Sequence, residues 1–182
     1  MNGWAPKSRL MRDIQQADTQ NFSGQLLIAH PSLLDPNFNR TVVLISAHTE
    51  DEGSLGVILN RPAGKTLGEL NAEYTYSPLS DIPIFNGGPV RSDEIILTAW
   101  FWEEASQVFR LYFGIDESKA LEIKMMNPDA EFRAFMGYAG WDGGQLEDEI
   151  DQQAWVTAHI EASVMESIEG EHFWKKVIRN VS

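Results

Sequence analysis

Gly137-Tyr138-Ala139-Gly140-Trp141-Asp142-Gly143-Gly144-Gln145-Leu146-Glu147 is the stretch of this chain with the most specific backbone requirements. Its four glycines stand within eight residues, which indicates backbone with positive φ or in very close contact with its neighbours. Two aromatic residues stand between these glycines, and an amphipathic helix is predicted directly after them. We interpret the stretch as a specific folded element that lets a β-rich body close, and it identifies no reaction.

Short strands are predicted over most of the chain on the N-terminal side of this stretch. The expected strands cover residues 25–29, 41–47, 55–59, 82–85, 94–100, 107–113 and 131–138. Fewer helices are predicted, over residues 66–70, 118–126, 145–154 and 171–179. Because strands and helices do not alternate regularly, the pattern favours a mixed α+β domain over a doubly wound fold.

Length and composition indicate one globular domain with an ordinary hydrophobic core. The chain has 182 residues, of which residues 1–21 are predicted to be a polar extension and residues 22–182 the folded domain. It has no cysteine, which excludes disulfides, thiolate metal sites and cysteine nucleophiles. The sequence shows neither a membrane-length apolar run nor the apolar core of a secretory signal, so we expect a cytoplasmic protein without membrane contact.

The formal net charge of −13 opposes direct contact with nucleic acid, since such contact depends on cations that displace phosphate counterions. We therefore expect no direct nucleic-acid binding. The simplest interpretation of the charge is solubility, and a basic partner is the alternative.

The tested catalytic and cofactor motifs are incomplete. Residues 59–66 end in Gly-Lys-Thr like a phosphate-binding loop, but Leu59 stands where the first glycine is needed and Pro62 removes a backbone donor. No Gly-x-Ser-x-Gly elbow is present. The four histidines are too far apart in sequence to form a metal-binding motif: His30, His48, His159 and His172. We therefore assign no catalytic residue, no metal ligand and no cofactor.

Three irregular turns, two of which contain glycine, remain as a candidate binding site, because loops carry function more often than their share of residues. They are residues 60–62, 86–89 and 137–144. Backbone N–H groups in such turns bind anions, and an arginine adds a fork of donors. The candidate ligand-binding residues are Asn60, Arg61, Gly87, Gly88 and Tyr138, and we expect them to converge on one concave pocket. The alternative is that these glycines serve only tight packing at strand ends.

Five segments together resemble the signatures of the YqgE/AlgH family of bacterial proteins. Residues 27–43 resemble its opening, Gly56-Val57-Ile58-Leu59-Asn60-Arg61-Pro62 its second signature and Asn86-Gly87-Gly88-Pro89-Val90 its third. Gly137-Tyr138-Ala139-Gly140-Trp141, with Gln145-Leu146-Glu147 and Trp155, resembles its most distinctive stretch, and His172-Phe173-Trp174 resembles its closing helix. The signatures stand in the family's order and span residues 22–179.

The resemblance implies a single α+β domain. Its sheet would be bifurcated and largely antiparallel, with part of it curled into a small closed β-barrel and with helices around it. The resemblance carries no catalytic residue, because the family's function is largely unassigned and some members are only labelled as transcriptional regulators.

Three functional hypotheses follow. We favour a non-enzymatic module that binds a protein or a small molecule, with an indirect regulatory role. A transcriptional regulator that acts on DNA is the second hypothesis, and an enzyme with a site built from the glycine turns is the third.

Overall fold

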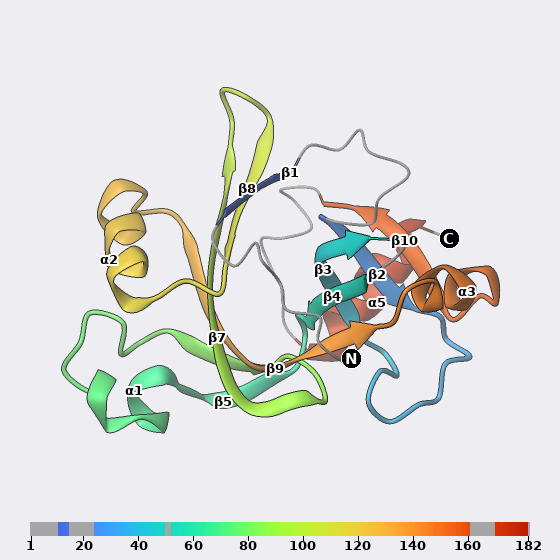
Figure 1. Ribbon diagram of the computed structural model, residues 1–182, viewed down its shortest axis with the longest axis horizontal. Helices are drawn as coiled ribbons and strands as arrows, with labels where there is room; N and C mark the ends of the chain where they lie inside the picture. The colour runs from blue at the N-terminus through green and yellow to red at the C-terminus, as the bar shows by residue number, and fades with distance from the viewer. Residues whose placement is uncertain (1–10, 15–23, 50–51, 161–169, 182) are drawn as a thin grey trace.

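Strand β9 (Glu131–Trp141) is the centre of the fold, because it pairs with three other strands along its length. The computed structural model describes residues 11–14, 24–49, 52–160 and 170–181, and Figure 1 shows β9 running between its two halves. One edge of β9 pairs antiparallel with β7 (Val90–Glu103). The other edge pairs first with β6 (Pro83–Asn86), in parallel, and then antiparallel with β4 (Gly53–Ile58).

The remaining elements extend these two halves. One half adds β1 (Met11–Ile14), β5 (Pro62–Thr66), β8 (Val108–Phe113), the helices α1 (Leu67–Leu70) and α2 (Glu117–Met126), and the short 3₁₀ helix η1 (Ala72–Tyr74). The other half adds β2 (Gln25–Ala29), β3 (Val42–Thr49), β10 (Trp155–His159), α3 (Gln145–Asp151) and α5 (Gly170–Val181). The result is a mixed α+β fold with a core made largely of sheet, as the sequence predicts.

The side-chain alternation of each strand sends neighbouring residues into different apolar clusters. In β2, Leu26 and Ile28 face the cluster shared by the two halves, while Leu27 and Ala29 face a cluster beside α3. The third cluster lies where α1 and α2 cover the other face of β7 and β9. Burial of both faces explains why β2 is an uninterrupted apolar run instead of an alternating one.

The closed barrel implied by the family resemblance is not found among the described strands, so this part of the prediction is wrong. The strand order runs β1-β8-β7-β9-β4-β3-β2-β10, and β1 and β10 do not pair with each other. Packing one half of the sheet on the other buries the shared apolar cluster, and helices cover the outer faces. This arrangement buries the core without the hydrogen-bonded closure that a barrel requires.

The predicted strands and helices lie where the sequence places them, with three additional strands. The additional strands are β1, β5 and β10. The helix predicted over residues 145–154 is α3, which ends earlier, at Asp151. Strand β9 continues through the first glycines of the glycine-rich stretch as far as Trp141. Of the predicted polar extension 1–21, the structure describes only residues 11–14, which pair with β8 as β1.

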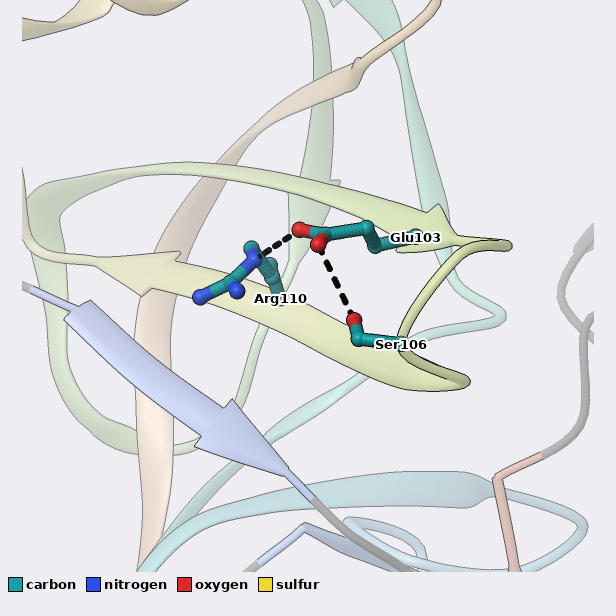
Figure 2. Close-up of polar contacts among 3 residues, drawn as sticks. All are labelled: Glu103, Ser106 and Arg110. Carbon is teal, nitrogen blue, oxygen red and sulfur yellow. Dashed lines mark hydrogen bonds and ion pairs between the residues drawn. The ribbon is translucent and has the colours of Figure 1, made fainter.

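The β7–β8 hairpin extends from the body of the fold, and three polar side chains stabilise its tip (Figure 2). The Arg110 guanidinium donates to the Glu103 carboxylate, and the Ser106 hydroxyl donates to the same carboxylate over 3.0 Å. These hydrogen bonds, with the charge of Arg110, hold the pKa of Glu103 below its ordinary value.

Within the described residues, no helix has the length and apolar character needed to cross a lipid bilayer.

Candidate functional site

The buried side chain of Asn60 joins two chain segments by hydrogen bonds. Asn60 lies two residues after the end of β4 and is only 4% exposed. Its side-chain oxygen accepts from the backbone N–H of Val42 over 2.9 Å, and its amide nitrogen donates to the carbonyl of Arg40 over 3.0 Å. The side chain therefore satisfies backbone groups at the start of β3, where the strand ladder cannot reach them.

Arg61 also serves the backbone. Its guanidinium donates to the carbonyl oxygens of Asn37 over 2.8 Å and of Asn39 over 3.1 Å, and this holds the loop before β3 against the end of β4. Partial burial lowers the pKa of Arg61, and the nearby carboxylate of Asp35 partly opposes this effect. An arginine remains charged at any physiological pH, so it leaves a positive charge beside this loop.

Gly87 and Gly88 lie where the strand that pairs with one edge of β9 changes from β6 to β4. Gly87 donates to the carbonyl of Met136 in β9 and accepts from the N–H of Ile58, so it links β6 to the end of β4. Gly88 has φ +153°, and a Cβ placed there would lie 2.2 Å from the carbonyl carbon of Tyr138. Glycine is required because the two backbones are in direct contact, as the packing alternative in the sequence analysis proposes.

Two hollows lie near the five predicted site residues, and neither is lined by all five. A polar hollow of about 190 Å³ contains Arg61 and Gly88 and is lined by Asn37, Ile58, Arg61, Asn86, Gly88, Pro89, Ser92 and Met136. Tyr138 instead lines a larger cleft, described next. Asn60 and Gly87 line neither of these two spaces. Met136 lines both, so the polar hollow and the larger cleft are neighbours beside β9.

The large cleft has a volume of about 570 Å³, which is within the usual range for small-molecule sites. It lies between α1 and η1, the first half of β7, the loop that leads into α2, and β9. Its apolar lining consists of Leu55, Leu67, Leu70, Ile95, Ile96, Leu97, Phe113, Ile115 and Met136. Its polar side chains are Asn71, Tyr74, Asp93, Glu94, Asp116, Glu117 and Tyr138.

The sequence analysis identified only Tyr138 among these residues. The four carboxylates come from two places: Asp93 and Glu94 from β7, and Asp116 and Glu117 from the start of α2. Asp116 caps α2 by accepting from the N–H of Lys119 over 2.8 Å, which is an ordinary helix signal. Their common location depends on the packing of α2 beside β7, which local sequence does not reveal.

The aromatic residues of the glycine-rich stretch belong to the core. Trp141 and Trp155 are each 3% exposed, and both indole N–H groups donate to the same carboxylate oxygen of Glu149 over 3.0 Å. The ring of Phe38 packs against both indoles. The rings fill the space between β9, β10 and α3, and this supports the interpretation of both tryptophans as core residues.

Two other polar groups, His30 and Arg133, have local structural roles. His30 Nδ1 lies 2.7 Å from the hydroxyl oxygen of Ser32, but the Ser32 N–H also donates to this nitrogen, and the pair forms an exposed local turn. Arg133 is 5% exposed; its guanidinium stacks on Phe85 and donates to the carbonyl of Leu59. Within the part of the chain that the structure describes, no three His, Asp or Glu side chains gather closely enough to hold a metal ion.

Comparison with known proteins agrees with the resemblance found in the sequence. A family described as AlgH-like matches residues 26–182. A UPF0301 protein of Streptomyces coelicolor is 36% identical over 170 residues, which cover 89% of this chain and 88% of the relative. A UPF0301 protein of Chlorobium luteolum is also 36% identical, over 165 residues, and covers 87% of this chain and 85% of the relative.

Two solved structures are similar to this fold. The solution structure of the AlgH protein from Pseudomonas aeruginosa has a TM-score of 0.63 and 25% identity, and it covers 93% of this chain and 94% of that chain. A crystal structure of a protein from Corynebacterium diphtheriae has a TM-score of 0.66 and 24% identity, with 92% and 90% covered.

Proposed function

Because the chain belongs to the AlgH-like family, whose function is uncharacterised, we propose from its geometry that it is a non-enzymatic binding module and that a small molecule occupies the large cleft. The observation that carries this proposal is the combination of a cleft of about 570 Å³ with an apolar floor and a limited set of polar side chains. Small-molecule sites commonly have this composition, with apolar contact providing affinity and a few polar groups fixing orientation.

The floor of the cleft supports a role in binding. Ile96 and Leu97 are successive residues of β7 that face opposite sides of the sheet, yet both line the cleft. Both residues lie inside the ladder with β9, where Ile96 pairs with Phe135 and Leu97 pairs with Ala134. The ladder is interrupted just before them, between Val90 and Ile95, and Asp93 and Glu94 of that segment also line the cleft.

The lining chemistry favours binding over catalysis. The described lining of the large cleft contains no serine, threonine, histidine or lysine, so neither a Ser–His type pair nor a lysine nucleophile is available there. Two of the residues predicted for a glycine-turn site, Asn60 and Arg61, donate to backbone carbonyls and are engaged in the fold. These observations favour a ligand site over the enzyme alternative.

A regulator that acts directly on DNA is not favoured by any described feature of the cleft. Its four carboxylates would repel phosphate, and the net charge of the chain is −13. An indirect regulatory role, through a ligand or a protein partner, stays part of the proposal, as does a cytoplasmic location.

The proposal is tested by blocking the cleft. Leu70 lines the cleft at the end of α1, and Leu70→Trp should fill part of it. Leu34→Trp is the matched control, because Leu34 is 81% exposed and lies outside the lining. A fragment library is screened by NMR against the full chain and both variants. We expect hits that shift cleft resonances in the wild type and in Leu34→Trp, with binding at least tenfold weaker in Leu70→Trp, on the order expected for loss of shape complementarity.

Hits that bind equally to all three proteins, or that shift only resonances outside the cleft, would contradict the assignment of the cleft. Turnover of any fragment would contradict the non-enzymatic part of the proposal.

A further inference from the structure

We propose that the ligand of the large cleft is an organic cation, a small molecule with an apolar body and an ammonium or similar charged group. This inference rests on the proposed function, since it names the class of ligand for the same cleft. It follows from two features of the lining, the sign of its charges and the apolar character of much of its surface, and Tyr138 adds a suitable polar side chain.

The charges of the lining all have one sign. Four carboxylates line the cleft, and the described lining includes no lysine, arginine or histidine. Glu94 is partly compensated, because Arg91 lies 3.6 Å away, and Arg91 itself is outside the lining. Asp93 is exposed and makes no ion pair with any described residue. A ligand with positive charge would relieve the repulsion among these groups, and a ligand with negative charge would add to it.

Helix capping accounts for only part of this charge. Asp116 and Glu117 stand at the start of α2, where the helix dipole and the free N–H groups favour acids without any ligand. Asp93 and Glu94 belong to a strand, in the segment where β7 departs from its ladder with β9. Strands favour β-branched and aromatic residues over aspartate, so local structure does not explain these two acids.

Tyr138 adds a polar side chain to the lining. Its side chain is 6% exposed and forms no hydrogen bond with any described residue. The hydroxyl is not one of the fully buried atoms left without a partner, so it does not require a ligand. Its oxygen accepts readily from the N–H of a ligand ammonium, and the ring faces of Tyr138 and Tyr74 attract a cation.

The floor of the cleft determines what carries the charge. Leu67, Ile95 and Ile115 are apolar, and such side chains cannot replace the water shell of an inorganic cation. Hydrated metal ions require several oxygen ligands, and the described residues contain no group of three acids or histidines suitably placed. An apolar body with one charged end therefore fits both parts of the lining.

Three probes of nearly equal shape test the charge requirement with the full chain. They are phenylbutylammonium, phenylbutanol and phenylbutyrate, titrated into labelled protein and followed by NMR at low salt. We expect the ammonium probe to bind on the order of tenfold more tightly than the alcohol, and the carboxylate probe to bind more weakly than both, because several partly exposed charges each contribute a small factor. Salt should reduce the preference for the ammonium probe.

Variants locate the source of the preference. The double variant Asp93→Asn with Glu117→Gln should weaken ammonium binding by about tenfold, or about threefold for each carboxylate, without changing alcohol binding. The control double variant Glu122→Gln with Asp129→Asn removes the same charge from exposed positions outside the lining and should bind the ammonium probe like the wild type. Tyr138→Phe should fold normally and bind the ammonium probe less tightly, because only the hydroxyl is removed.

The possible outcomes separate this inference from the proposed function. Equal binding of the ammonium and alcohol probes in the cleft would overturn the cationic class and would leave the cleft as a ligand site. Equal loss in both double variants would also overturn it, because the preference would then come from net charge alone. Absence of cleft shifts with all three probes would overturn both proposals.

Discussion

Replacing Asn60 by alanine tests whether this predicted site residue serves the fold instead of a ligand. The amide oxygen accepts from the Val42 N–H and the amide nitrogen donates to the Arg40 carbonyl. Val42 is fully buried, so its N–H would lose its partner without access to water, at a cost of about 1–3 kcal/mol. The Arg40 carbonyl belongs to an exposed residue and can be hydrated, so its loss costs about 0.5–1 kcal/mol.

The expected loss is therefore about 1.5–4 kcal/mol of the free energy of unfolding, which corresponds to a fall in Tm of roughly 3–16 °C for a chain of this length. Denaturant unfolding followed by tryptophan fluorescence gives the free energy, and calorimetry gives the Tm. Asn37→Ala is the matched control: it removes the same side chain from an exposed position in the neighbouring loop and should change stability by less than about 0.5 kcal/mol.

The reasoning about Asn60 fails if Asn60→Ala and Asn37→Ala unfold at the same denaturant concentration. In that case the amide would not stabilise the start of β3, and Asn60 would return to the group of candidate ligand-binding residues. A loss of stability together with normal binding of cleft ligands would instead support the role of Asn60 in holding the start of β3 by hydrogen bonds.

Two further predictions concern carboxylates outside the cleft. Glu149→Ala leaves the buried indole N–H groups of Trp141 and Trp155 without their acceptor and should lower the free energy of unfolding by roughly 2–5 kcal/mol. Glu149→Gln keeps one acceptor oxygen and should recover part of this loss in the same denaturant assay. Equal stability of the wild type and both variants would contradict the role of Glu149 as the acceptor for both indoles. Glu103 should titrate by NMR with a midpoint below its ordinary pKa of 4.5, and Arg110→Gln should raise that midpoint toward 4.5. Since the pKa of Glu103 is lowered by folding, its ion pair stabilises the hairpin above pH 4.5, and this contribution disappears as the pH falls through the lowered pKa. An unchanged midpoint in Arg110→Gln would show that the hydrogen bond from Arg110 does not lower the pKa of Glu103.

Local sequence predicted the elements whose own residues favour one conformation. The apolar run of β2 was predicted with its observed bounds, and the start of α2 was predicted within one residue. In the structure Asp116 caps this helix. The exceptions depend on partners. Strand β5 contains Pro62 and Gly64, which disfavour a strand, and it forms only because β6 pairs with it.

The glycine-rich stretch shows the same limit within a single element. Its glycines were interpreted as irregular backbone, yet residues as far as Trp141 continue β9 because β7 and β4 supply hydrogen-bond partners. The close contact of Gly88 with Tyr138 agrees with tight backbone packing. Neither of the two spaces is lined by all five candidate residues, and their role in binding stays a prediction.

The sequence by itself determined the α+β class, the family and most strand and helix positions, because these follow from composition, residue patterns and local backbone preferences. Only the tertiary structure decided that the sheet stays open, that Asn60 and Arg61 support the backbone, and that four carboxylates line one cleft with Tyr138. The physical reason is that these properties arise from contacts between residues far apart in the chain. Such contacts depend on how β7, β9 and α2 pack together, and no local segment encodes that packing alone.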